Sequence, residues 1–329
     1  MVLSKNMQKL VAGSSTIRKL FEEGIELAKE VGAENVYDFS LGNPAAPVPE
    51  EVKKSIYDIL ENRNANFVHC YMPNAGYPEV REKVAANLNK KYNSSFTKDD
   101  IIMTVGAAGG INCVLRSLLE PEDEVLCFAP FFGEYNSYVM NFGGNLKVVP
   151  ADYETFQLNV EEADKYITER TKAVIINNPN NPTGALMSRE QLEEIVEIAR
   201  GVGAYILCDE VYRHLTQEDS WSESIADLYE KGISVSRMSK VFSLAGLRLG
   251  WTATHDGAAL CAFLSHRDYN LISCGMFDDA VASIALRHSD AMLRRNQTIV
   301  RENLAILDAW VAAHEHFYYT KPKAGTTAL

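Results

Sequence analysis

The chain has 329 residues, 47% of them hydrophobic, which is enough for one large α/β domain with a smaller second one. The formal net charge is −12 and no basic cluster is present, so nucleic acid is not expected as a partner. The six cysteines form no CxxC pair, and residues 1–18 contain neither a long apolar core nor a cleavage signal. These features predict a cytoplasmic protein with reduced thiols, no metal site and no membrane span.

The N-terminal part is expected to be mostly helical. Apolar residues recur near the helical period over 14–32, followed by a strand-like run at 36–40 and a turn-rich segment at 41–49. A helix opened by its proline is expected over 49–60, and an amphipathic helix over 76–91.

Strands and helices then alternate. Short apolar runs predict strands at 101–105, 124–128, 146–149, 173–176, 205–208 and 233–236. The capping box Ser188-x-x-Gln191 begins one of the intervening helices. This alternation predicts a doubly wound, largely parallel α/β sheet. A long helical run is expected from 276 towards 316, and 317–329 reads as a strand and turn with nothing to pair with.

In such sheets the ligand lies at the carboxyl ends of the strands. Polar, small or aromatic residues follow separate apolar runs, so one site is predicted from Gly106-Ala107-Ala108, Phe132, Asn181, Asp209 and Lys240. A lysine at a strand end tends to lose its proton through desolvation, and the neutral amine can form a Schiff base with an aldehyde. Arg248 would then be a fixed cation for a phosphate. The pair suggests pyridoxal 5′-phosphate (PLP), although for the two residues taken alone an ordinary loop lysine and a surface arginine are the favoured explanation.

The glycine- and alanine-rich stretch 106–110 lies between a strand and a helix, where backbone N–H groups can approach an anion. A tight turn is the simpler reading. The stretch matches neither GxGxxG nor a P-loop, which disfavours a nicotinamide or ATP enzyme.

The Asn-Pro run at 177–184 favours a turn, and its position after a strand could hold an asparagine amide towards a ligand. Asp209 could pair with a protonated ring nitrogen or simply cap a helix, and Tyr212 could point to the same ring. Phe132 could stack on a ring or belong to the core.

Three motifs occur in this order: Asn181-Pro182-Thr183-Gly184, Asp209-x-x-Tyr212, and Ser239-Lys240 with Arg248. With these motifs the chain resembles the fold-type I PLP enzymes of the class I/II aminotransferase family, whose members are similar to aspartate aminotransferase. The resemblance implies the PLP-dependent transferase fold, with a mostly parallel seven-stranded sheet between helices in a large domain at 46–285. It also implies an N-terminal arm and part of the small domain at 1–45, and an incomplete α+β small domain at 286–329.

The resemblance also implies roles. Lys240 would form the Schiff base with PLP and move the proton, Asp209 would pair with the pyridine nitrogen, and Tyr212 and Asn181 would contact the ring oxygen. Phe132 would stack on the ring, and Gly42 with Asn181 would meet the substrate. The phosphate would be held by Gly106, Ala107, Ala108, Ser239, Arg248 and, from the neighbouring subunit of a homodimer, Tyr71.

Two departures from the family pattern stand out. Arg237 occupies the position three residues before the lysine, where many members carry a phosphate-binding serine. It could contribute a charge instead or point away, so it is left out of the predicted site. The arginine that clamps the substrate carboxylate in the family lies beyond residue 329, so the chain is expected to be a fragment.

The predicted function is an aminotransferase acting between an L-amino acid and a 2-oxo acid. A lyase or cyclase of the same fold, such as a carbon–sulfur β-lyase or a capreomycidine synthase-like enzyme, would share these residues. A non-catalytic ligand sensor would carry a DNA-binding segment, which residues 1–18 do not resemble.

Overall fold

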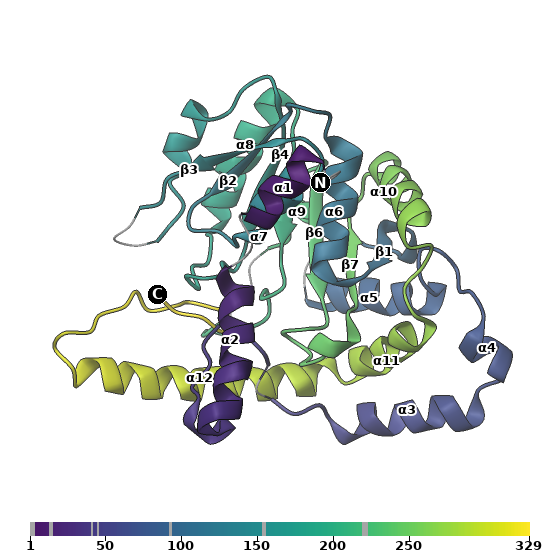
Figure 1. The fold of residues 1–329 in the computed structure, drawn as a ribbon. Coiled ribbons are helices and arrows are strands. Elements are labelled where there is room, and N and C mark those ends of the chain that lie inside the picture. The colour runs from purple at the N-terminus through teal and green to yellow at the C-terminus, as the bar shows by residue number, and fades with distance from the viewer. Residues whose placement is uncertain are drawn as a thin grey trace.

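The computed structural model describes residues 4–12, 16–40, 42–44, 46–91, 94–152, 156–218 and 223–329. At its centre lies a seven-stranded sheet with the order β1-β7-β6-β5-β4-β2-β3 (Figure 1). The strands are β1 (Ile101–Thr104), β2 (Glu124–Phe128), β3 (Asn145–Val149), β4 (Thr171–Asn177), β5 (Tyr205–Asp209), β6 (Gly232–Arg237) and β7 (Gly250–Ala253). The predicted seven-stranded α/β sheet is confirmed.

Five neighbouring strands, in the order β6-β5-β4-β2-β3, pair in parallel. Strand β7 pairs antiparallel with both β6 and β1. Strand β7 was not among the predicted strands. Its first residue must be glycine, because a Cβ on Gly250 would lie 2.5 Å from the Ser236 carbonyl oxygen and 2.9 Å from the Gly106 carbonyl carbon. The start of this antiparallel strand therefore lies against both the end of β6 and the start of α6 (Gly106–Leu118).

Helices cover both faces of the sheet. One face packs on α5 (Pro78–Lys91), α6 (Gly106–Leu118), α7 (Glu134–Met140) and α10 (Gly257–Asn270), and α11 (Met276–Arg287) packs on α5. The other packs on α8 (Arg189–Val202) and α9 (Ile225–Leu228). Alternation within β2 explains both contacts, since Val125 and Cys127 belong to the first core and Leu126 and Phe128 to the second.

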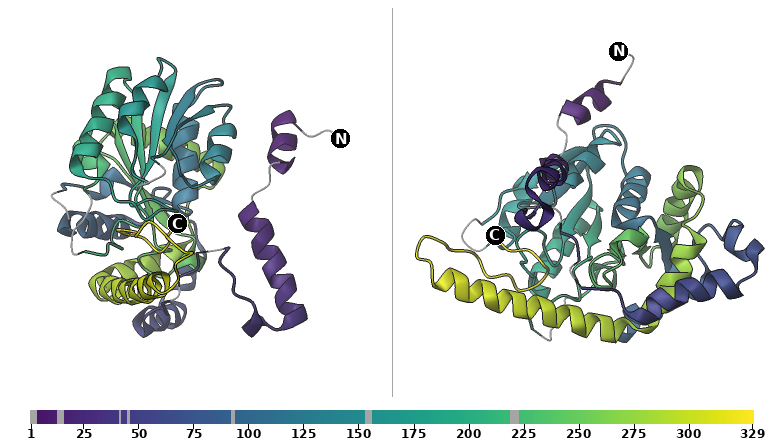
Figure 2. Two further views of the ribbon diagram at one scale, coloured as in Figure 1. Left: turned by 90° about the vertical axis from the view of Figure 1, so that its left-hand side faces the viewer. Right: turned by 60° about the horizontal axis from the view of Figure 1, so that its bottom comes forward.

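The remaining helices lie outside these layers. They are α1 (Lys5–Ala12), α2 (Thr16–Val31), α3 (Glu50–Asn62), α4 (Ala65–His69) and the long α12 (Ser289–Ala312). Figure 2 shows α1 and α2 standing away from the sheet and α12 running along one side of the molecule. The helices expected at 14–32, 49–60 and 76–91 are confirmed within a few residues.

Two expected strands are absent from the described residues. The run at 36–40 forms no strand, and Tyr37 and Phe39 are 81% and 94% exposed, because no other strand lies beside it. The segment 317–329 is also irregular, but it does pair: Ala324 forms a bridge with Thr216, and the Gly325 N–H donates to the Leu215 carbonyl at 2.7 Å. The expectation that this segment lacks a partner is wrong.

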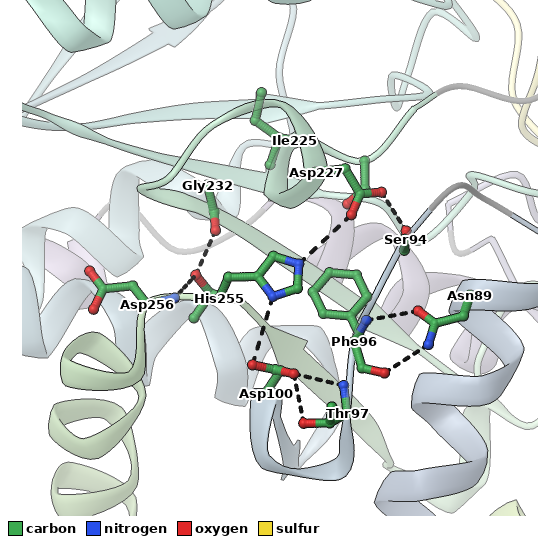
Figure 3. Close-up of polar contacts among 12 residues, drawn as sticks. Asn89, Ser94, Phe96, Thr97, Asp100, Ile225, Asp227, Gly232, His255 and Asp256 are labelled. Atoms are coloured by element: carbon green, nitrogen blue, oxygen red, sulfur yellow. Dashed lines mark hydrogen bonds and ion pairs between the residues drawn. The ribbon is translucent and has the colours of Figure 1, made fainter.

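Hydrogen bonds join the amino ends of the parallel strands to the segment after β7. Tyr205, the first residue of β5, donates to Asp256 at 2.8 Å, and the Thr254 hydroxyl donates to the Gly232 carbonyl at 2.7 Å. His255 stacks on Phe96 with 4.5 Å between ring centroids, between the carboxylates of Asp100 and Asp227 (Figure 3). These contacts join the strand starts to the segment leading into β1.

Candidate active site

Lys240 lies three residues beyond the end of β6. Its Nζ donates a hydrogen bond to the Gly42 carbonyl and lies 5.8 Å from the centroid of the Tyr212 ring. Burial and the nearby Arg237 cation lower the pKa of Lys240 to about 8, against the attraction of Asp209. A large neutral fraction of the amine is therefore present at mildly alkaline pH, as a nucleophile requires.

Asp209 ends the neighbouring strand β5 and is buried. Its Oδ2 accepts from the Tyr135 hydroxyl at 2.9 Å, and its Oδ1 accepts from the Val211 N–H at 3.3 Å. Burial raises the pKa of Asp209, opposed by the charge of Arg237 and by these hydrogen bonds. A buried carboxylate with few donors gains most from an added cationic N–H group.

Asn177, the last residue of β4, connects this strand end to the Asn-Pro turn. Its side-chain amide donates to the Asp209 carbonyl at 2.8 Å, while its Oδ1 accepts from the Asn181 N–H at 2.7 Å. The half-buried Asn181 is thereby fixed beside the end of β5, as its predicted role requires.

The turn between β1 and α6 is open to an anion. Helix α6 begins at Gly106, which has φ +64°, and its N-cap residue Val105 makes no side-chain capping bond. A Cβ on Gly106 would lie 3.3 Å from Nη2 of Arg248, and Nη1 of Arg248 donates to the Ala245 carbonyl at 2.9 Å. Uncapped first-turn N–H groups beside a guanidinium form a typical anion-binding arrangement.

Aromatic rings line the same end of the sheet. The half-buried Phe132 lies edge-on to Tyr135, with 5.6 Å between the ring centroids. Tyr212 is buried, and burial raises the pKa of its hydroxyl, opposed by Arg237 and by a hydrogen bond with Thr326. Both rings are positioned near Asp209 and Lys240 by the strand ends that precede them.

A cavity of about 280 Å³ opens beside Lys240. One wall is the apolar side of α12, with Ile299, Val300 and Leu304, and another is the segment around Gly42. The C-terminal residues Gly325, Thr326 and Thr327 complete the lining. A small organic molecule in this cavity would lie next to the lysine amine.

The structure thus gathers most of the predicted site residues at the carboxyl edge of the sheet. Ala107 and Ala108 lie in the first turn of α6, and Ser239 is buried beside Lys240. Tyr71 is different: it lies after α4 and is 86% exposed, so its expected contact with a neighbouring subunit stays a prediction.

Three residues of this site were missed. Tyr135 lies in the first turn of α7, three residues after Phe132, and the short spacing of the two aromatic residues could have indicated it. Asn177 sits inside the Asn-Pro run but was not distinguished from its neighbours. Arg237 was left without a role, although its charge acts on Lys240, Asp209 and Tyr212.

Two features are absent from the described residues. Across the part of the chain that is described, no cluster of three or more His, Cys, Asp or Glu side chains is arranged for a metal ion. In the same residues, no helix has the length and apolar character needed to cross a membrane.

Comparison with known proteins agrees with this geometry. Residues 33–326 match the family described as aminotransferase class I and II. An aspartate aminotransferase of Pyrococcus abyssi is 37% identical over 244 residues, covering 73% of this chain and 60% of the relative. An aromatic-amino-acid aminotransferase of Thermococcus litoralis is 37% identical over 262 residues, covering 78% and 64%. The matched part therefore spans less than two thirds of the length of these relatives.

Solved structures show the same relationship. A double mutant of the aspartate aminotransferase of Thermus thermophilus superposes with a TM-score of 0.89 at 26% identity, covering 99% of this chain and 84% of that one. An aminotransferase of Eubacterium rectale superposes with a TM-score of 0.87 at 29% identity, covering 99% and 83%. The chain belongs to the class I and II aminotransferase family.

Proposed function

We propose that this protein is a PLP-dependent aminotransferase, which moves an amino group between an L-amino acid and a 2-oxo acid. The observation that carries the proposal is the lysine amine of Lys240, whose pKa is lowered to about 8 and which borders the cavity. Related proteins named aspartate and aromatic-amino-acid aminotransferases support an amino acid as the donor.

The residues present fit PLP. Among the described residues Asp209 forms no ion pair, and a protonated pyridine nitrogen would give this buried carboxylate the cationic donor it lacks. Because residue 106 is glycine, no side chain fills the space next to Arg248. A bound phosphate requires such a space beside the helix N-terminus. The donor set would comprise the N–H groups of Ala107 and Ala108 with the side chains of Ser239 and Arg248.

When bound, PLP supplies the ring that stabilises the negative charge left after the Cα–H bond breaks. Lys240 would supply the base: its neutral Nζ would take the proton from the substrate Cα and deliver it to the former aldehyde carbon of the cofactor. Asp209 would hold a proton on the ring nitrogen, Tyr212 and Asn181 would orient the ring oxygen, and Phe132 would cover a ring face. Gly42 borders the space for the substrate.

The proposal is tested by a half-reaction. The PLP-loaded protein is mixed with one amino acid at a time, beginning with L-aspartate and L-phenylalanine, and the products are measured. An aminotransferase converts the cofactor to pyridoxamine phosphate with release of one equivalent of 2-oxo acid. Release of pyruvate and ammonia would instead identify a lyase, and the absence of any product across a full amino-acid panel would favour a ligand sensor.

The variant Lys240→Ala tests the assignment of the base. Turnover is expected to fall by about 10⁴-fold, the upper end of the range for a lost proton-transfer group. The cofactor is also expected to lose its covalent attachment, measured as the mass added to the protein after borohydride reduction. Lys231→Ala, at the other end of β6, is the matched control, and equal losses in both variants would contradict the assignment.

We infer further that two copies of the chain form the working enzyme. The arm helix α2 exposes Leu20, Ile25, Leu27 and Val31 by 45% to 50% each and stands away from the sheet (Figure 2). Leu20, Leu27 and Val31 share one face of the helix, and such a face of exposed apolar side chains fits an interface. Tyr71 would reach the partner's phosphate site. The cytoplasmic location and the domain limits at 1–45, 46–285 and 286–329 stay predictions.

A further inference from the structure

Arg237, the last residue of β6, carries a buried polar atom that the site described so far does not use. Its Nε is buried and has no hydrogen-bond partner among the described residues. An unmade hydrogen bond on a buried charged group is costly, so its retention calls for an acceptor that joins the site. The acceptor must be an anion or a carbonyl, since a guanidinium only donates.

The backbone places Arg237 next to the anion-binding turn. In the sheet Arg237 is paired with Gly250, and a Cβ on Gly250 would lie 3.1 Å from the Cβ of Arg237 and 2.9 Å from the carbonyl carbon of Gly106. Gly106 in turn is close to Nη2 of Arg248. The two arginines therefore flank the same glycine turn, one from β6 and one from the loop before β7.

The charges around Arg237 are mixed. Its guanidinium attracts Asp209 and repels the Lys240 ammonium. Burial raises the pKa of Tyr138, and the charges of Arg237 and Arg248 oppose this rise. Arg237 and Arg248 thus bring two permanent positive charges to the same glycine turn, which favours a ligand with two negative charges. A phosphate monoester has this charge near neutral pH.

We propose that Arg237 is a second phosphate-binding arginine of this site and contacts the PLP phosphate from the β6 side, opposite Arg248. The planar guanidinium presents several donors in a fixed arrangement that matches phosphate oxygens, which a serine at this position would not. The proposal rests on the proposed binding of PLP at Lys240 and adds to it a specific source of phosphate affinity.

The test compares two ligands that differ only in the phosphate group. Binding of PLP and of pyridoxal is followed by the visible absorbance of the ligand attached to Lys240, in the wild type and in Arg237→Gln. The variant is expected to bind PLP about 10- to 100-fold more weakly, the range for a lost charge-assisted hydrogen bond. Its affinity for pyridoxal is expected to change by less than about twofold.

Arg237→Lys is the second variant. It keeps the positive charge but not the planar donor arrangement, so its PLP affinity is expected between those of the wild type and Arg237→Gln. Arg248→Gln is the positive control for a loss that depends on the phosphate. Inorganic phosphate should also compete with PLP more strongly in the wild type than in Arg237→Gln.

Other outcomes would overturn the inference. Equal losses for PLP and pyridoxal would mean that Arg237 acts through Asp209 or Lys240 and not on the phosphate, and unchanged PLP affinity would mean that it has no role in binding. A wild type that attaches neither ligand to Lys240 would contradict the proposed function itself. The two failures are therefore distinguished by the wild-type measurement alone.

Discussion

Two aspartates, at opposite ends of strand β5, each accept a hydrogen bond from a tyrosine hydroxyl. Asp256, beside the start of β5, accepts from Tyr205 at 2.8 Å, and Asp209, at the end of the same strand, accepts from Tyr135 at 2.9 Å. Their pKa values shift in opposite directions. Although burial acts to raise it, the pKa of Asp256 is lowered by the N–H groups of Ala259 and Ala258 and by the Tyr205 hydroxyl, whereas burial dominates at Asp209 and raises its pKa.

The difference lies in what the carboxylates do. Asp256 caps α10 and accepts from two helix N–H groups, so its negative charge is fully used within the fold. Asp209 lies deeper and has fewer donors, which leaves its charge poorly compensated until a cation arrives. At the amino ends of the strands the carboxylate stabilises the fold. At the carboxyl ends the carboxylate keeps a poorly compensated charge, which a cationic ligand group would neutralise.

The residue following Asp209 sharpens this comparison. Glu210 is buried, and its carboxylate accepts from Arg213 at 2.8 Å and from the hydroxyls of Ser224 and Ser234 at 2.9 and 2.6 Å. Although it sits at the ligand-binding edge, it is satisfied like Asp256. It belongs to the fold and not to the chemistry.

The largest effect on stability is expected from Glu210→Ala. The change leaves the Arg213 cation buried without its carboxylate, so the free energy of unfolding in urea should fall by about 3–5 kcal/mol. The control Glu197→Ala removes an exposed carboxylate paired with Arg200 and should cost less than about 1 kcal/mol. Similar costs in the two variants would show that the buried network adds nothing.

The next effect separates the two aspartates directly. Asp209→Asn should lower turnover by roughly 10²- to 10³-fold, as for a lost preorganised electrostatic partner, without lowering the stability of the cofactor-free protein. Asp256→Ala should do the reverse, with unchanged turnover and a loss of about 1 kcal/mol in the free energy of unfolding, because the cap of α10 is removed. Steady-state kinetics and urea unfolding of both variants measure the two effects. Equal changes in turnover and in the free energy of unfolding in the two variants would refute the distinction between the aspartates.

The smallest expected effect is a pH dependence. The pKa of Lys240 is lowered from 10.5 to about 8, so the unfolded chain binds this proton more tightly than the folded one. The cost to stability grows as the pH falls from 10.5 to about 8 and is constant below that. Lys240→Met should therefore be more stable than the cofactor-free wild type at pH 7, and this advantage should shrink as the pH rises to 10.5.

Urea unfolding across this pH range measures the difference between the two proteins. Lys231→Met is the matched control, because Lys231 lies at the other end of β6 and donates to the Gly203 carbonyl at 2.8 Å. The same pH-dependent advantage in both variants would show that Lys240 is not its source.

Much of this arrangement could be predicted from the sequence. The β-branched runs mark the parallel strands, and because these strands end at one edge, Asn181, Asp209 and Lys240 had to lie together. Strand β7 could not be read in the same way, since its four residues follow a loop and pair in the opposite direction. The run at 36–40 has strand-like residues but no neighbour, and strands form only when paired.

The limits within the site have a similar cause. Tyr135 and Asn177 act through contacts with Asp209, across a distance of 74 and 32 residues along the chain. A single sequence shows which side chains stand at strand ends but not which second residue reaches them. Only the folded structure identified the partners.

The hydrogen bond from Lys240 to the Gly42 carbonyl links two processes. The lysine Nζ joins the segment after the N-terminal arm to the large sheet, and the same nitrogen is the one expected to bond covalently to a cofactor. The two uses would compete for one atom, so a ligand bonded to this nitrogen would weaken its contact with Gly42. By thermodynamic reciprocity, whatever holds the segment at Gly42 away from Lys240 would favour the bond to the ligand. The position of this segment would thereby be coupled to ligand attachment through a single amine.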